Sequence, residues 1–188
     1  MKYNSEVLLP IDTTSIDNIA NKAAVMVLIC PDQQGVLVVH KADFLRRHAG
    51  EMAFPGGKLE HNESFLACAM RECLEEVGFD QQCYQLLGQL PARSTRHKVQ
   101  VIPFVARLVK SQPIQIDQEE LQDAFYISIK HLEDPHHHRH RRAKIDGEWM
   151  ELDYYFFQRE NNGQLLDYKI WGVTAHIISD FLKMEMTF

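Results

Sequence analysis

The chain has 188 residues, of which 45% are hydrophobic and 24% charged, and its formal net charge is −6. This composition excludes collagen-like, low-complexity and disordered chains, and the acidic balance argues against a general nucleic-acid binder. The length suits one domain of ordinary size, so a single domain over 1–188 is expected. The longest unbroken apolar run, Ala23–Cys30, is far shorter than the roughly 20 residues that a membrane span needs.

The N-terminus has no basic region followed by an apolar stretch, so no secretory signal is expected. The four cysteines form neither a CxxC pair nor a Cys/His metal spacing. They could make two disulfides, but a chain of this length without a signal favours reduced thiols. These features predict a cytoplasmic or organellar protein that has no membrane partner.

The first part of the chain predicts two strands followed by a loop. Residues 1–20 read as a polar lead-in with a short helix. Ala23–Cys30 is short, apolar and followed by proline, as is typical of a buried strand, and Gly35–His40 is its expected partner. Residues 41–57 show no clear period and end on Phe54-Pro55-Gly56-Gly57, which is loop chemistry.

A helix is predicted over residues 63–77, with Asn62 as its N-cap and Gly78 as a left-handed residue after its last turn. Further along, strands are predicted over Val99–Val109, Ala124–Ile129 and Tyr154–Phe157. A second helix is predicted over Trp171–Met184. Strands mixed with two main helices favour an α/β or α+β sandwich over a barrel.

Residues 131–153 contain the sequence PHHHRHRR and are the compositional outlier of the chain. We expect them to form a variable, solvated surface excursion. Histidine- and arginine-rich tracts can also bind zinc or a nucleic-acid backbone, so both alternatives stay open.

Three acidic residues near the end of the predicted helix, Glu72, Glu75 and Glu76, share one face at spacings of three and four. Like charges at these spacings repel, and the second half of a helix disfavours anions. Two readings are open: a solvated acidic face partnered by Arg71 and Arg46, or a divalent cation site. Mg²⁺ takes carboxylate oxygens, water and phosphate, and the glycine turn upstream allows close backbone approach to a ligand. The cation site is therefore favoured.

The spacing from Gly57 onward is five residues, Glu63, seven residues and then the run from Arg71 to Phe79, RECLEEVGF. This resembles the complete Nudix box, G-x5-E-x7-R-E-U-x-E-E-x-G-U, where U is apolar. Every charged and glycine position is filled, and Cys73 serves as a small hydrophobe at an apolar position. The resemblance to the Nudix hydrolase superfamily implies an α/β/α sandwich with a mixed β-sheet. It also implies hydrolysis of a nucleoside diphosphate linked to another moiety.

Carried over by position, the resemblance implies Glu72 and Glu76 as direct ligands of Mg²⁺ or Mn²⁺. Glu75 would be a ligand directly or through water, and the carbonyl of Gly56 would complete the set. Arg71 would orient the carboxylates. The structural positions of the box would be Gly57, Glu63 and Gly78.

The flanking segment is similar to the signature of coenzyme A pyrophosphatases, L-L-T-x-R-[S/A]-x3-R-x3-G-x3-F-P-G-G. The matching positions are Leu37, Ala42, Arg46, Gly50 and Phe54–Gly57. Val39 stands at the threonine position and Lys41 at the arginine position, where lysine loses the bidentate fork. Similarities at 120–127 and 170–175 extend the resemblance over about 23–182. The implied reaction converts coenzyme A or its thioesters to 3′,5′-ADP and 4′-phosphopantetheine or its acylated form.

Coenzyme A is a polyanion, so a protein of net charge −6 needs local positive charge to bind it. The candidate cations near the two loops are Lys41, Arg46, Arg47, His48, Arg96 and Lys98. Each of them could instead be a solvated surface base. For the carboxylate that removes a proton from the attacking water, Glu120 is the first candidate, with Glu75 and Glu76 as alternatives.

Three functions remain open from the sequence. The first is hydrolysis of coenzyme A, and the second is the same chemistry on ADP-ribose, a dinucleotide or a nucleoside triphosphate. The third is a non-catalytic nucleotide sensor, which would be expected to have lost carboxylates of the box. The expected partner is an anionic nucleotide substrate and not a nucleic acid, and a homodimer is expected from family analogy alone.

Overall fold

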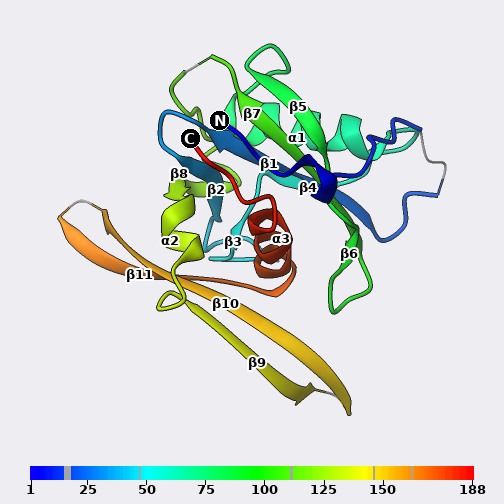
Figure 1. Cartoon of the computed structure of the whole chain (residues 1–188). Helices are drawn as coiled ribbons and strands as arrows, with labels where there is room; N and C mark the ends of the chain where they lie inside the picture. The colour runs from blue at the N-terminus through cyan, green and yellow to red at the C-terminus, as the bar shows by residue number, and fades with distance from the viewer. Residues whose placement is uncertain (15–17, 47, 111, 146, 162) are drawn as a thin grey trace.

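A mixed sheet forms the centre of the computed structural model, which describes residues 1–14, 18–46, 48–110, 112–145, 147–161 and 163–188 (Figure 1). Within these residues the main strand order is β3-β2-β1-β7-β5, and three further strands join it: β4 on β1, β6 on β7 and β8 on β2. β1 and β7 run parallel, whereas the other pairs of this sheet are antiparallel. The strands are β1 (Lys22–Cys30), β2 (Gly35–Lys41), β3 (Met52–Ala53), β4 (Gly56–Lys58), β5 (Tyr84–Gln89), β6 (Arg93–Ser94), β7 (Gln100–Leu108) and β8 (Leu121–Ser128).

A second sheet follows in the chain and holds β9 (His138–Ile145), β10 (Glu148–Asn161) and β11 (Gln164–Trp171) in the order β11-β10-β9. The helices are α1 (Phe65–Val77), α2 (Ile129–Glu133) and α3 (Gly172–Leu182), and a 3-10 turn, η1, covers Ser5–Val7. In Figure 1, β9 and the first half of β10 project away from the rest of the molecule. None of the helices in the described ranges is long and apolar enough to cross a membrane.

The alternation of β1 divides the core into two layers. Met26 and Leu28 belong to one buried cluster with side chains of α1, while Val27 and Ile29 belong to another with side chains of α3. Successive residues of a strand point to opposite faces, so a strand covered on both sides is apolar throughout. The result is the expected α/β/α sandwich with a mixed β-sheet.

The first turn of α1 differs from the expected start. Ser64 is the N-cap, and its hydroxyl accepts a hydrogen bond from the amide of Ala67 at 3.1 Å. Asn62 has a φ of +61°, in the left-handed region, whereas an N-cap needs extended backbone. The expectation that Asn62 caps the helix is therefore wrong. The left-handed conformation expected of Gly78 is confirmed by its φ of +77°.

Residues 131–153 are mostly strand and not an irregular loop, and β9 is exposed along most of its length, as expected of a solvated surface segment. β9 pairs with β10 along its length, and Asp153 Oδ1 lies 2.8 Å from His138 Nε2 and 2.9 Å from His140 Nδ1. The aromatic strand Tyr154–Phe157 is the middle of β10, whose Tyr155 and Phe157 pack into the core cluster that contains α3. Charged residues on both faces of β9 hide its period in the sequence.

The left-handed position of Gly78 generates a stability prediction. In Gly78→Ala the added Cβ would lie 3.0 Å from the Cβ of Gln115 and would hold a φ that L residues disfavour. We expect the free energy of unfolding to fall by about 1–2 kcal/mol in urea denaturation. Gly78→Asn should lose less, because asparagine tolerates this conformation. Equal losses in the two variants would contradict the backbone explanation.

Candidate active site

The candidate site begins at Gly56 and Gly57, the first two residues of β4, which pairs with β1 and contacts α1; they form the glycine turn expected from the sequence only in the sense that they allow a close approach. Gly56 has a φ of +155°, and a Cβ on it would lie 2.3 Å from the carbonyl oxygen of Ala24. A Cβ on Gly57 would lie 2.2 Å from Glu72 Oε1. Gly56 therefore requires glycine, because a side chain would push β4 away from the backbone of β1, and a side chain at Gly57 would displace the Glu72 carboxylate.

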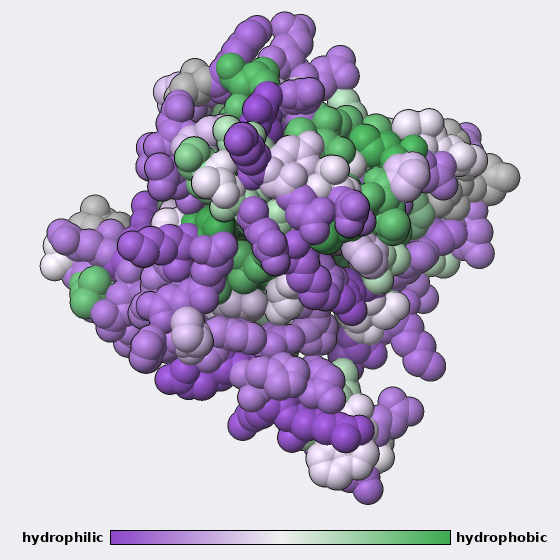
Figure 2. Space-filling view, viewed as in Figure 1, coloured by the Kyte–Doolittle hydropathy of each residue, from purple (hydrophilic) through white to green (hydrophobic). Residues whose placement is uncertain are grey.

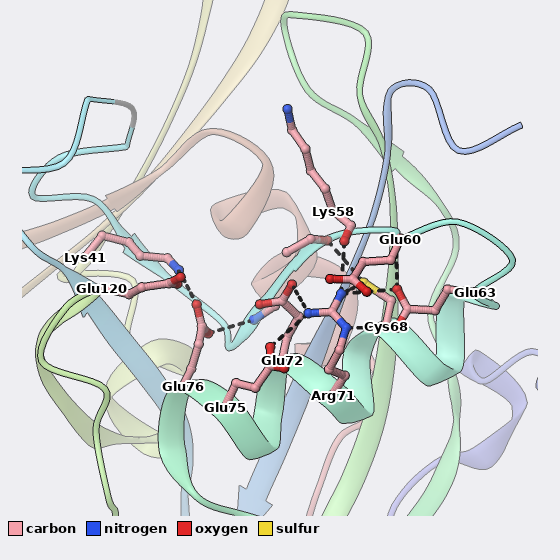
Figure 3. A network of polar contacts seen from close by, with 12 residues as sticks. Lys41, Lys58, Glu60, Glu63, Cys68, Arg71, Glu72, Glu75, Glu76 and Glu120 are labelled. Atoms are coloured by element: carbon pink, nitrogen blue, oxygen red, sulfur yellow. Dashed lines mark hydrogen bonds and ion pairs between the residues drawn. The ribbon is translucent and has the colours of Figure 1, made fainter.

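Arg71 is the centre of the polar network on α1 (Figure 3). Its Nε donates to Glu63 Oε1 at 3.0 Å, and its Nη1 donates to Glu72 Oε1 and Glu75 Oε2, both at 2.9 Å. Its Nη2 donates to the second oxygen of Glu63 at 3.1 Å and to the carbonyl of Lys58 at 3.2 Å. One guanidinium thus ties the β4 segment to the helix and offsets the repulsion among the carboxylates.

The environment shifts the pKa values of two of these carboxyl groups in opposite directions. Burial raises the pKa of Glu72, although Arg71 acts against this shift. Burial also acts to raise the pKa of Glu63, but hydrogen bonds from Arg71 and from the amide of Glu60 outweigh it and lower that pKa. Glu63 is therefore held ionised as a structural partner of Arg71, as its box position implies.

Glu76 is the deepest of the acidic residues, with 1% of its surface exposed. Its Oε2 accepts a hydrogen bond from the amide of Gly56 at 3.0 Å, and its Oε1 is paired with Lys41 Nζ. Burial raises the pKa of Glu76 to about 7, although the Lys41 ammonium and the Gly56 amide favour the ionised form. Lys41 also lies 3.8 Å from Glu120 Oε2, so one ammonium bridges an acid on α1 and an acid beside β8.

The structure brings part of the predicted site together. Glu72, Glu75, Glu76, Glu120 and Lys41 all lie in or beside the network drawn in Figure 3. Sequence reasoning assigned Lys41 to a substrate phosphate and did not foresee its pairing with Glu76. The two residues are 35 positions apart, and no local signal links them.

The other candidate cations lie farther out. Arg46 is exposed in the loop after β2, and among the described residues it contacts none of the box carboxylates. His48 Nδ1 lies 2.8 Å from Glu51 Oε2 in the same loop. Arg96 lies in the loop between β6 and β7, and Arg47 is outside the described residues.

The donors present fit a hard divalent cation, because carboxylate oxygens of Glu72 and Glu76 adjoin Gly57 and Gly56, and Glu75 shares Arg71 with Glu72. In the described part of the chain no three metal-ligating side chains converge on one point, and the acids are instead paired with Arg71 and Lys41. The amide of Gly56 contacts Glu76, so the ligand role of its carbonyl stays a prediction.

Comparisons with known proteins bear on the family and the fold. The NUDIX domain family matches residues 20–164. A protein of Salmonella paratyphi B named "Uncharacterized Nudix hydrolase NudL" is 28% identical over 181 residues, which is 93% of this chain and 88% of the relative. The relative of the same name from Salmonella newport matches equally.

Two solved structures share the fold at low identity. The Ap4A hydrolase of C. elegans superposes with a TM-score of 0.51 and 17% identity, over 57% of this chain and 80% of that one. A MutT/nudix family protein from Enterococcus faecalis gives a TM-score of 0.51 and 19% identity, over 92% of this chain and 62% of that one. At these identities the likeness extends to the fold alone.

The pairing of Lys41 with a buried acid generates a prediction on stability. Lys41→Met leaves Glu76 without its cation, so at pH 8 with EDTA we expect the free energy of unfolding to fall by about 3 kcal/mol. Urea denaturation followed by circular dichroism measures this loss. Lys41→Arg retains the charge and should lose less. Unchanged stability in Lys41→Met would show that the pairing is unimportant.

The raised pKa of Glu76 generates a prediction on metal binding. The pKa of Glu76 is about 7, so at lower pH its carboxyl is protonated. The proton then competes with a divalent cation for the same oxygens. Mn²⁺ affinity, measured by calorimetry, should therefore rise from pH 6 to pH 8, by up to about tenfold per pH unit on the acid side. Glu76→Gln should bind more weakly and lose this dependence. A flat affinity in the unsubstituted protein would contradict the assignment.

Proposed function

Because the chain belongs to the NUDIX domain family, we propose that it hydrolyses the diphosphate bond of coenzyme A or its thioesters. Hydrolysis of phosphoric anhydrides is the activity that the family and the relatives named Nudix hydrolase support, and the chain is a hydrolase of this class. The proposed products are 3′,5′-ADP and 4′-phosphopantetheine, acylated where a thioester is the substrate.

The observation that carries the proposal is the buried Glu76 between the glycine turn and Lys41. We assign Glu72, Glu75 and Glu76 to hold Mg²⁺ or Mn²⁺. When bound, such an ion lowers the pKa of a coordinated water and stabilises charge on the diphosphate. Arg71 holds the carboxylates of Glu72 and Glu75 side by side through its two 2.9 Å hydrogen bonds.

Glu120 is proposed to accept the proton of the attacking water. Its side chain is 52% exposed and lies within reach of the Lys41 ammonium, so it can meet both solvent and substrate. Glu75, also exposed, is the alternative base. In this arrangement Lys41 would release the acids as the substrate binds and donate to a phosphate oxygen.

Coenzyme A is favoured by the position of the signature loop beside the site. The amide of Lys41 donates to the carbonyl of Glu51 at 3.0 Å, and the amide of Gly50 donates to the carbonyl of Lys41 at 3.2 Å. The loop is therefore closed at its base, and Arg46 is presented to solvent where a polyanion could contact it. This arrangement supports a role for Arg46 in substrate binding.

A second candidate is the same chemistry on ADP-ribose, a dinucleotide or a nucleoside triphosphate. One observation favours it: Lys41 replaces the signature arginine and is turned inward to Glu76. A bidentate phosphate contact is thereby lost at the position that the coenzyme A signature specifies.

The cysteines support a proposal on location. Cys30, Cys68, Cys73 and Cys83 are all buried free thiols. Burial raises the pKa of Cys68 and of Cys73 to about 12, so these thiols stay protonated and unreactive. We therefore propose a reducing compartment such as the cytoplasm.

Product analysis tests the proposed substrate. The protein is incubated with Mg²⁺ or Mn²⁺ and, separately, with coenzyme A, acetyl-coenzyme A, ADP-ribose, NADH and a nucleoside triphosphate, and the products are resolved by mass spectrometry. We expect selective formation of 3′,5′-ADP from the two coenzyme A substrates. Glu76→Gln is the matched control and should lose at least about 100-fold in kcat.

Turnover of another substrate in preference to coenzyme A would contradict the proposed substrate but not the hydrolase activity. Ligand binding by both proteins without turnover by either would favour the nucleotide sensor.

A further inference from the structure

The outer face of the second sheet carries a row of aromatic side chains that the active site does not use. Tyr155 and Phe157 of β10 face the core, and the alternation of the strand places Tyr154 and Phe156 on the opposite side. In the register of the sheet Trp171 lies opposite Tyr154 and therefore shares this outer face.

Two of these rings are exposed, and Tyr154 is partly buried. Phe156 is 40% exposed and Trp171 is 48% exposed. The rings of Tyr154 and Phe156 are nearly parallel, with an interplanar angle of 21° and 6.2 Å between their centroids. Exposed aromatic side chains in a row form a surface on which successive planar groups can stack.

Three cations surround the same tyrosine. The guanidinium of Arg141 lies 5.4 Å from the ring centroid of Tyr154, and Lys169 Nζ lies 5.8 Å from it. Arg139 is the register partner of Tyr154 on β9, and its Nη1 donates to backbone carbonyls. Within the described residues none of these three cations has a carboxylate partner, in a chain whose net charge is −6.

The opposite face of β9 is different. Arg142, one residue further along the strand, points to the other side and is paired with Glu151 at 3.4 Å. His140 on that side contacts Asp153. Lys144 shares this side and is exposed, so both faces of β9 carry positive charge, and the outer face is distinguished by the aromatic row beside its cations.

The nature of a partner follows from charge and shape. The anions that the register places on this face, Glu148, Glu160 and Asp167, lie four or more positions along the strands from Tyr154, so the cations form a local cluster. A second copy that brought two such clusters together would oppose like charges, which is unfavourable. Figure 2 shows hydrophilic residues over the part of the molecule where β9 and β10 project, so this region is not a broad apolar patch. The face instead suits a partner that is anionic and carries planar groups at regular intervals.

We propose that the outer face of β9, β10 and β11 binds single-stranded nucleic acid. Bases would stack on Tyr154, Phe156 and Trp171, and phosphates would contact Arg139, Arg141 and Lys169. The acidic net charge led us to expect no nucleic-acid partner, but affinity depends on the local charge of one face. The histidine- and arginine-rich tract forms β9, and in this proposal its unpaired arginines bind phosphates.

A pair of variants on one strand tests the proposal. Fluorescence anisotropy measures binding of a labelled oligothymidylate and oligouridylate of ~20 nucleotides at low salt, with EDTA present to prevent hydrolysis. Arg141→Gln should weaken binding by at least about 5-fold and reduce the salt slope by about 0.7. Arg142→Gln removes the same charge from the other face and should stay within about twofold. Phe156→Ala should also weaken binding by at least about 5-fold.

Several results would overturn the proposal. These are no binding of either single strand, equal losses in Arg141→Gln and Arg142→Gln, or tighter binding of the matching duplex. Arg141-dependent binding to phosphatidylserine vesicles without binding to the oligonucleotides would assign the face to a membrane surface. A dimer in solution that Phe156→Ala dissociates, without oligonucleotide binding, would assign it to a second copy. Because hydrolysis is not measured, the outcome is independent of the proposed enzymatic activity.

Discussion

The neutralisation of four carboxylates on one short segment is the constraint on which the rest of the site depends. Glu63, Glu72 and Glu75 are held by a single guanidinium, that of Arg71, and Glu76 is held by Lys41. A helix that gathers anions near its C-terminal end is unfavourable without such partners. The two cations therefore stabilise an arrangement that a divalent ion can use, since the same oxygens are its preferred ligands.

The sheet supplies the positions of these partners. β4 pairs with β1 and places the glycine turn against α1, while β2 ends at Lys41. β8 pairs with β2, so Glu120, just before β8, meets the end of β2. The candidate site thus lies where three strand ends meet one helix face. Substitutions in this region are expected to affect stability and metal binding together, because the same contacts serve both.

The second sheet differs from the first in how its faces are covered. The middle of β10, Tyr154–Phe157, is aromatic on both faces, and the core covers only the face of Tyr155 and Phe157. β10 is 14 residues long, and β9 is attached chiefly to β10. Aromatic side chains on the open face are costly to leave in solvent, and Arg139 and Arg141 of β9 and Lys169 of β11 share that face with them. These features make it the part of the molecule most suited to a further partner.

The sequence by itself determined the box, the glycine turn, helix α1, the two central strands and the general chemistry, because each is encoded in local spacing. The N-cap predicted at Asn62 was wrong, because asparagine is favoured both in caps and in left-handed turns. β9 was not predicted, because charged residues on both of its faces remove the alternation of polar and apolar residues that is typical of a strand. Only the tertiary structure decided that Lys41 partners Glu76 and that Tyr154, Trp171 and Arg139 meet on one face. These contacts join residues far apart in the chain, and only strand register and burial bring them together.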